Sequence, residues 1–439
     1  MLYRLLKFLI SIGIRLYYKE VRVLNRRNLP QKGPLIIISN HPNTLMDAWV
    51  LGMICKQPIY YMAKATLFDS KFKLKILKSL NLIPINRQGE GFIKGVSNDD
   101  SLNECYRILS EGKTLVIFPE GTSYKERVLR KLKSGTARIA LETEKRNNGK
   151  LGLQVVAVGL NYSQPEKFRS RILIDVDKPR GVVEFLDEYR ENGRSAAQKL
   201  TTQFRTRLEN VLLTSETKEE EALLDAIYQV INSKNVPSNG KGVRGEVKQM
   251  KEIKNRIDEI KILQPWLLTE IHLKIRAINW KFQKMKIRAD FLDRNFKYRL
   301  FLQQTLISLF FVLLALPVFI IGVVHHFIQF KLTDWIIPKL SKDIEYYAPF
   351  AVFLGLFIYP IFYAGFLFLA HILFGLSWTG MLIYLIVLPL SGLFAYWFLR
   401  YLRHISNKWH YIFLMVDRKE ALIELQKEKL KLKQLIFDE

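Results

Sequence analysis

The sequence is poor in cysteine and in acidic residues, and it lacks the common nucleophile motifs. Its two cysteines, Cys55 and Cys105, form no CxxC pair and no cluster with histidine, which excludes a disulfide framework and gives no zinc-site pattern. No GxSxG sequence occurs, so a serine nucleophile on a strand-to-helix elbow is not predicted. The formal charge of +26 predicts an anionic partner: nucleic acid, an acidic membrane surface or a phosphorylated substrate.

Motifs for nucleic-acid recognition are also missing. No helix-turn-helix, zinc-finger or RNP-like pattern accompanies the basic residues. Basic side chains beside membrane spans are explained by anionic lipid, which attracts each of them by about 1 kcal/mol. We therefore expect membrane lipid, and no nucleic acid, as a partner. We also expect salt to weaken membrane association of the C-terminal segment.

The second half of the chain contains long runs without charge. No Lys, Arg, Asp or Glu lies between Glu345 and Arg400, and a membrane span needs about 20 apolar residues. Two spans are predicted there, near 348–374 and 381–399, and residues 305–324 supply a third. Basic residues flank both ends of this region, so the positive-inside rule leaves two topologies open. Either 348–374 is a re-entrant hairpin or one basic flank lies on the outer side.

The N-terminal residues predict a helix on the membrane surface. Arg4, Lys7, Ser11 and Arg15 recur at helical spacing and form a polar stripe opposite leucine and isoleucine. This pattern favours an interfacial helix over a cleaved signal peptide, and a solvent-facing stripe on a soluble helix is the alternative.

Between residues 30 and 162, short apolar runs alternate with stretches of helical spacing. This alternation predicts the α/β class, with a mixed or largely parallel sheet flanked by helices. In such sheets reactive groups collect at the carboxyl ends of strands. The predicted parts of the whole chain are an interfacial membrane helix at 1–20, the α/β domain at 21–215, a basic helical connector at 216–300, a transmembrane region at 301–402 and a basic amphipathic C-terminal helix at 403–439.

The stretch "IIISNHPNTLMDAWV" places a histidine and an aspartate where a buried strand ends and a helix begins. Residues six apart on one continuous helix point to different faces, so a turn between His41 and Asp47 is required for them to meet. Asn43 is a plausible N-cap of the helix. If the pair meets, Asp47 accepts the Nδ1 proton and leaves Nε2 free to take a proton from a hydroxyl.

Two further stretches place polar residues after predicted strands. In "LIPINRQ", Arg87 follows an apolar strand, where a guanidinium can bind phosphate through two hydrogen bonds. In "FPEGTS", Glu120 stands in a turn where Gly121 and Thr122 offer N–H and hydroxyl donors to an anion. Lys133 follows in "KLKSGTARIA", just before a predicted helix. Taken alone, these residues are equally consistent with a surface ion pair, for Arg87, or an ordinary turn, for Glu120.

Together these stretches resemble the glycerophospholipid acyltransferase superfamily, which contains lysophosphatidate and glycerol-3-phosphate acyltransferases. "NHPNTLMD", "LIPINR", "FPEGTS" and "VVAVGLNY" are similar to its four ordered blocks, within residues 35–162. The sequence departs from the common pattern because five residues, not four, separate His41 from Asp47. This spacing resembles that of fungal-type glycerol-3-phosphate and dihydroxyacetone-phosphate acyltransferases and bacterial relatives. Asn86 and Ala157 also depart from the usual blocks.

The resemblance implies that His41, oriented by Asp47, deprotonates a hydroxyl of lysophosphatidate or glycerol 3-phosphate as it attacks an acyl thioester, in phospholipid synthesis. The donor is carried on coenzyme A or acyl carrier protein, and no cofactor is implied. The implied acceptor-binding residues are Arg87, Glu120, Gly121, Thr122 and Lys133. An integral membrane protein with its acyltransferase domain on the cytoplasmic face is expected. A catalytically silent domain attached to a lipid-transport or scaffold region is the alternative.

Overall fold

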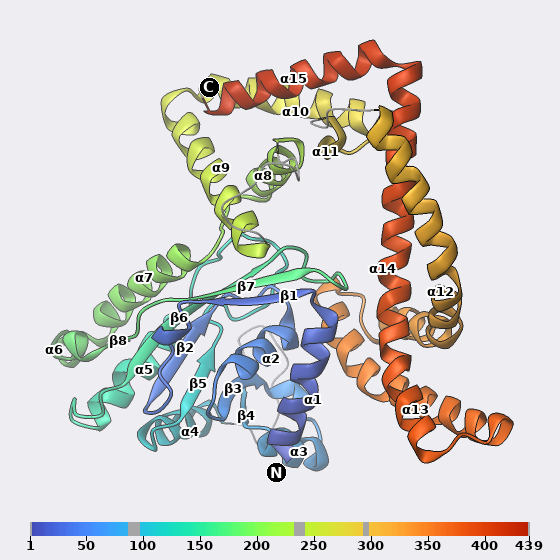
Figure 1. Cartoon of the computed structure of the whole chain (residues 1–439). Helices are drawn as coiled ribbons and strands as arrows, with labels where there is room; N and C mark the ends of the chain where they lie inside the picture. The colour runs from blue at the N-terminus through green and yellow to red at the C-terminus, as the bar shows by residue number, and fades with distance from the viewer. Residues whose placement is uncertain (1, 87–96, 232–241, 293–297, 438–439) are drawn as a thin grey trace. The chain divides into compact units, whose positions relative to one another are not determined.

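The computed structural model describes residues 2–86, 97–231, 242–292 and 298–437 (Figure 1). The chain forms two compact units. The first comprises Met1–Glu221, Gly242–Val247 and Ser341–Phe353, and the second comprises Ala222–Lys241, Lys248–Leu340 and Leu354–Glu439. Ser341–Phe353 therefore belongs to the first unit, although the helix that begins at Tyr347 continues in the second.

The first unit is built on an eight-stranded sheet in the order β1-β7-β6-β2-β5-β3-β4, with β8 paired to β6. The pairs β1/β7, β6/β2, β2/β5, β5/β3 and β3/β4 are parallel, whereas β6/β7 and β6/β8 are antiparallel. The predicted mixed, largely parallel sheet is confirmed. The strands are β1 Glu20–Leu24, β2 Leu35–Ser39, β3 Ile59–Lys64, β4 Leu82–Ile85, β5 Thr114–Ile117, β6 Gln154–Tyr162, β7 Arg171–Val176 and β8 Arg180–Gly181.

Helices cover both faces of this sheet, as predicted for the α/β class. They are α1 Leu2–Tyr17, α2 Thr44–Ile54, α3 Lys71–Ser79, α4 Asn98–Ser110, α5 Gly135–Arg146, α6 Leu186–Glu191 and α7 Gly193–Val211. Three short 3₁₀ turns accompany them: η1 Arg26–Asn28, η2 Ala65–Phe68 and η3 Val183–Phe185.

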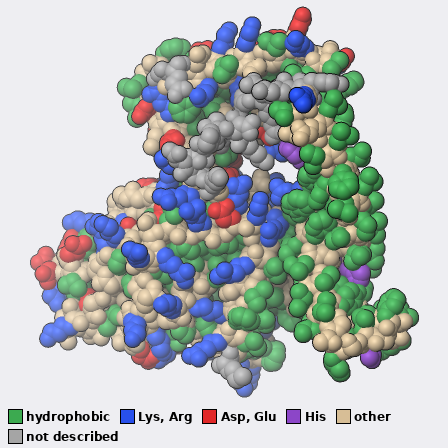
Figure 2. Space-filling model, in the orientation of Figure 1, with side chains coloured by type: hydrophobic (Ala, Val, Ile, Leu, Met, Phe, Trp, Pro, Cys, Tyr) green, Lys and Arg blue, Asp and Glu red, His purple; other side chains and the backbone are tan. Residues whose placement is uncertain are grey.

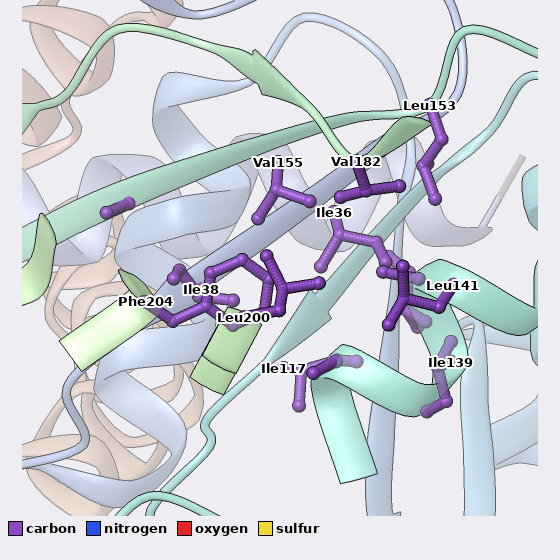
Figure 3. Close-up of a cluster of buried hydrophobic side chains, with 14 of the residues drawn as sticks. Ile36, Ile38, Ile117, Ile139, Leu141, Leu153, Val155, Val182, Leu200 and Phe204 are labelled. Carbon is purple, nitrogen blue, oxygen red and sulfur yellow. The ribbon is translucent and has the colours of Figure 1, made fainter. Parts of the chain in front are cut away.

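The central strand β2 is buried on both faces because its side chains alternate between two apolar clusters. Ile36 and Ile38 pack with side chains of α4, α5 and α7 (Figure 3). Leu35 and Ile37 pack on the other face with side chains of α1 and α2. A strand enclosed in this way has a fixed register, and the position of the turn that follows it is fixed as well.

Helix α1 buries Ile14 and Tyr17 against the sheet and leaves a second apolar face exposed within the first unit. Lys7 of the predicted polar stripe turns toward the domain, and its Nζ donates a hydrogen bond to the Cys55 carbonyl oxygen at 2.6 Å. Exposed apolar side chains follow the helix on another side: Leu2, Leu5, Phe8, Ile12 and Leu16. The helix therefore has the amphipathic form expected of an interfacial segment.

The second unit is helical, and among the described residues three helices, the second of which begins in the first unit, are long and apolar enough to cross a membrane. These are Arg299–Leu340, Ile344–Phe374 and Trp378–Asp417, with hydropathies of 2.9, 2.2 and 2.1, and hydrophobic side chains cover the surface of this region (Figure 2). The unit and its links to the first contain α8 Lys218–Ile231, α9 Val243–Leu263, α10 Pro265–Met285, α11 Ala289–Leu292, α12 Tyr298–Leu340, η4 Ile344–Tyr346, α13 Tyr347–Phe374, α14 Trp378–Asp417 and α15 Lys419–Phe437.

Two features of these apolar helices bear on the sequence predictions. The alternative in which 348–374 forms a re-entrant hairpin is wrong, because α13 is one continuous helix through Pro360. Helices α12 and α14 approach each other closely, since a Cβ added to Gly322 would lie 2.3 Å from the Ser391 carbonyl oxygen. Small residues at such a crossing are typical of helix pairs in membranes.

Candidate active site

The predicted histidine–aspartate pair lies where β2 ends and α2 begins. His41 stands in the turn after Ser39, and Asp47 lies in the first turn of α2. The turn brings the side chains together, with His41 Nδ1 3.0 Å from Asp47 Oδ2. A carboxylate in the first turn of a helix is also favoured by the helix dipole.

The Asp47 carboxylate is fully buried and has three hydrogen-bond partners. Its Oδ2 accepts a hydrogen bond from the backbone N–H of Asn43 at 2.7 Å and contacts His41 Nδ1. Its Oδ1 accepts a hydrogen bond from the Tyr162 hydroxyl at 2.6 Å. Because the carboxylate is an acceptor, Nδ1 carries the imidazole proton and Nε2 has its lone pair free. The pair has the form of a general base with an orienting group.

Tyr162, at the end of β6, was not singled out from the sequence. Burial raises its pKa well above the ordinary value, and the neighbouring Asp47 charge adds to the shift, so the phenol remains a hydrogen-bond donor. Strands β6 and β2 are parallel neighbours, so their carboxyl ends lie at the same edge of the sheet. A polar residue ending "VVAVGLNY" could have been proposed as a site residue on that rule.

The predicted N-cap role of Asn43 is only partly correct. Asn43 occupies the N-cap position of α2, but its side chain makes no capping hydrogen bond. The amide Nδ2 instead donates to the Tyr18 hydroxyl at 3.0 Å and to the Pro165 carbonyl oxygen at 2.9 Å. The Asp47 carboxylate accepts a hydrogen bond from the backbone N–H of Asn43 and also contacts His41, so one side chain fixes both the start of the helix and the imidazole.

The imidazole is held from a second side by the segment after β5. The Phe118 ring stacks on the His41 ring with centroids 3.8 Å apart and an angle of 8° between the planes. The backbone N–H of Tyr124 donates to the His41 carbonyl oxygen at 3.0 Å. The histidine therefore has its ring and its backbone fixed by different neighbours, and its side chain remains 17% exposed.

Glu120 lies beside this turn and binds backbone amides. Its carboxylate accepts hydrogen bonds from the backbone N–H of Arg130, at 3.2 Å, and of His41. Burial raises the pKa of Glu120, and the two hydrogen bonds oppose that shift. The side chain thus joins the His41 turn to the loop that follows β5, which sequence reasoning did not foresee.

Gly121 and Lys133 come together in the same loop. Gly121 has a φ of +83°, and its N–H donates to the Phe118 carbonyl oxygen at 3.0 Å. A Cβ added at Gly121 would lie 2.6 Å from Lys133 Nζ, so the lysine side chain lies directly over the glycine. Thr122 follows in the turn and is half-buried. Arg87 lies outside the described residues.

Neither cysteine is suited to act as a nucleophile. Both thiols are buried, and burial raises the pKa of Cys55 and of Cys105 to about 12. Among the described residues, no group of three or more His, Cys, Asp or Glu side chains could hold a metal ion. The chemistry that the site offers is abstraction of a proton by an oriented imidazole.

A family model described as Acyltransferase matches residues 20–161 of the chain. The 1-acyl-sn-glycerol-3-phosphate acyltransferase of Bacillus subtilis is 34% identical over 121 residues, which cover 27% of this chain and 56% of that protein. Glycerol-3-phosphate O-acyltransferase 1 of Saccharomyces cerevisiae is 30% identical over 131 residues, which cover 29% of this chain and 17% of that protein.

A solved structure also aligns with the chain. The crystal structure of the 1-acyl-sn-glycerophosphate acyltransferase from Thermotoga maritima matches 47% of this chain and 78% of that one, at 19% identity and a TM-score of 0.34. The chain spans about half the length, or less, of the curated relatives it matches. The α/β domain carries the features of an acyltransferase domain. Residues 20–161 match the Acyltransferase family, and the named relatives support the glycerophospholipid acyltransferase superfamily for this domain.

Proposed function

We propose that the protein is a membrane-bound O-acyltransferase that acts in phospholipid synthesis. It moves a fatty acyl group from an acyl thioester to a hydroxyl of lysophosphatidate or glycerol 3-phosphate. The observation that carries the proposal is the contact of His41 Nδ1 with the buried Asp47 carboxylate at 3.0 Å, in a domain of this family. Relatives named for both acceptors support the substrate class.

The proposed reaction is direct transfer without an acyl-enzyme. His41 Nε2 takes the proton of the acceptor hydroxyl while the oxygen forms a bond to the thioester carbonyl carbon. The tetrahedral intermediate then breaks its C–S bond, and the departing thiolate receives the proton from the imidazolium. General-base assistance of this kind typically contributes a factor of about 10² to 10⁴. No cofactor is required beyond the donor carried on coenzyme A or acyl carrier protein.

The proposed acceptor-binding residues are Glu120, Gly121, Thr122 and Lys133, together with Arg87. The Lys133 ammonium, which lies over Gly121, supplies a positive charge close to the loop that contacts His41. The acceptor phosphate would bind this ammonium and the arginine, and its hydroxyl would then be presented to Nε2.

The membrane setting fits a product with long acyl chains. Three helices are apolar and long enough to span a bilayer, and α1 exposes Leu5 and Phe8. We propose that the acyltransferase domain works on the cytoplasmic face, with membrane lipid as its partner and no nucleic acid. Some of the 67 basic residues would then face anionic headgroups.

The first test is acyl transfer by the full-length protein in detergent, with lysophosphatidate, glycerol 3-phosphate and dihydroxyacetone phosphate offered in parallel. Each acceptor is tried with both donor carriers. His41→Ala should lower the rate by about 10² to 10⁴. His272→Ala is the matched control, because that imidazole contacts a backbone carbonyl of its own helix, at Leu268, and should leave the rate unchanged.

The result of this assay distinguishes an active acyltransferase from a catalytically silent domain. Transfer that depends on His41 would identify the acceptor and support the enzyme. If His41→Ala retains the wild-type rate, the proposed base is wrong. If folded protein transfers to none of the acceptors, another acceptor or the silent-domain alternative would be favoured.

A further inference from the structure

The segment Ser341–Phe353, which comprises η4 and the first residues of α13, is packed into the first unit although it lies far beyond residues 20–161 in sequence. Ala348 is fully buried and Val352 is 5% exposed, and both belong to the apolar cluster that contains Met46 and Val50 of α2. Apolar burial therefore fixes this segment against the helix that carries the catalytic aspartate.

Glu345, in the 3₁₀ turn η4, contacts both the loop that follows β5 and the start of α2. Its Oε2 accepts a hydrogen bond from the Ser123 hydroxyl at 2.6 Å, and its Oε1 accepts one from the Lys125 backbone N–H at 3.0 Å. Its backbone oxygen accepts a hydrogen bond from the Thr44 hydroxyl at 3.0 Å. One residue thus joins the loop of the "FPEGTS" stretch to the first residue of α2.

The carboxylate form of Glu345 is supported by these contacts. Each of its two oxygens has a donor from the protein, the Ser123 hydroxyl for one and the Lys125 backbone N–H for the other. Hydrogen bonds to a charged acceptor are shorter and about twice as strong as neutral ones. The side chain is therefore suited to hold a loop in place.

The loop that Glu345 contacts has little regular structure of its own. Between the end of β5 and the start of α5, the only strand-like pairing is an isolated bridge from Val128 to Ser215. The path of this loop is fixed by particular hydrogen bonds, among them Gly121 N–H to Phe118, Arg130 N–H to Glu120 and Lys125 N–H to Glu345. Glu345 also binds the Ser123 hydroxyl next to Thr122, so its loss removes two of the contacts that hold this part of the loop.

We propose that Glu345 is a positioning residue for the acceptor site. It holds the loop of Gly121 and Thr122 against the His41 turn, although it lies at the start of Ile344–Phe374, a stretch long and apolar enough to span a membrane. The inference rests on the proposed function, since the acceptor is taken to bind this loop. It adds that residues 20–161 do not by themselves complete the site.

The test uses full-length protein with Glu345→Ala and Glu345→Gln. The alanine variant should raise the KM for the acceptor about tenfold, as expected for loss of a charge-assisted hydrogen bond, while the KM for the thioester donor stays unchanged. Glutamine keeps one acceptor oxygen for the Lys125 N–H and should recover part of the loss. Ser123→Ala combined with Glu345→Ala should be no worse than Glu345→Ala alone.

Asp343→Ala is the matched control, because Asp343 is an exposed acid in the same segment whose backbone, not its side chain, bonds to Tyr346. It should leave both KM values unchanged. Equal acceptor KM in the wild type and in Glu345→Ala, or a fall in kcat alone without a change in KM, would overturn the proposal. A fall in kcat without a change in KM is what partial unfolding of the variant would give.

Hydrogen exchange supplies a readout that needs no turnover. The Lys125 amide should exchange at least tenfold faster in Glu345→Ala than in the wild type, whereas amides of β2 should be unaffected. Unchanged exchange at Lys125 would refute the positioning role even if the enzyme is active. Faster exchange in a protein that transfers to none of the acceptors would instead count against the proposed function and leave the contact itself supported.

Discussion

Replacement of Asp47 by asparagine separates the charge of this side chain from its role in orienting the imidazole. In one orientation the amide oxygen faces both His41 Nδ1 and the Asn43 N–H, and the NH₂ group faces the Tyr162 hydroxyl. That hydroxyl can rotate to accept a hydrogen bond. In the opposite orientation the NH₂ group would face two other donors, His41 Nδ1–H and the Asn43 N–H. The first orientation is therefore preferred, and it keeps the proton on Nδ1.

The expected loss follows from the charge alone. Two unit charges about 4 Å apart attract each other by about 4 kcal/mol at an effective dielectric constant of about 20, and Asp47 Oδ2 lies 3.0 Å from His41 Nδ1. The imidazolium forms only as the proton is transferred, so this attraction lowers the barrier. Asp47→Asn should thus lower kcat by about 10² to 10³.

Asp47→Ala should cost more and should also destabilise the domain. It removes the group that orients the imidazole. It also leaves the buried Asn43 N–H and Tyr162 hydroxyl without their acceptor, which costs about 1 to 3 kcal/mol of folding free energy for each group. We expect kcat to fall by about 10⁴ and the melting temperature to fall clearly below that of the asparagine variant.

The assay is release of thiol from the acyl thioester at saturating acceptor, with a thermal melt of each detergent-purified variant. An asparagine variant that keeps kcat within threefold of the wild type would refute the electrostatic role of Asp47. Equal melting temperatures for the two variants would refute the account of the buried donors.

Three other perturbations test the surroundings of the base. N-ethylmaleimide at pH 7 should leave the mass of the folded protein unchanged, because Cys55 and Cys105 are buried with pKa values of about 12; labelling before denaturant is added would contradict this. Gly121→Ala should lower kcat/KM for the acceptor about tenfold, since a side chain at φ +83° is strained and its Cβ would meet Lys133 Nζ at 2.6 Å; an unchanged kcat/KM would show that the turn adjusts freely. Phe118→Leu should lower kcat by about 2- to 12-fold because the ring stacked on the imidazole is worth about 0.5–1.5 kcal/mol, and an unaltered kcat would argue against a role for stacking.

Local sequence patterns predicted the parts of the site that local structure determines. The apolar run before His41 fixes a buried strand, and the polar residues after it fix a turn, so the meeting of His41 with Asp47 could be foreseen. The mixed sheet and its helices followed from the same alternation of apolar runs. The first strand, β1 Glu20–Leu24, was missed because its burial is only partial and its partner β7 lies far away in sequence.

Contacts between distant segments could not be predicted in this way. Tyr162 meets Asp47 across 115 positions, and Glu345 meets Ser123 across 222. No periodicity or motif spacing encodes such pairs, since they depend on which strands become neighbours and which loop reaches over them. Glu345 also stands at the edge of an apolar run, where its sequence context indicates only the end of a membrane span.

The site contains several carboxylates, although the proposed acceptor is a phosphate ester and the chain as a whole is strongly basic. Each carboxylate is committed to donors of the protein: Asp47 to three groups, Glu120 to two backbone amides, and Glu345 to a hydroxyl and an amide. Their negative charge is therefore largely compensated where it stands, and their contribution is to fix the geometry of the loops. Attraction of a phosphate must come from basic groups instead, and the Lys133 ammonium over Gly121 is one described group placed to provide it. Such a site can hold its base rigidly and still bind an anion, because hydrogen bonds from the protein offset the negative charge of its carboxylates.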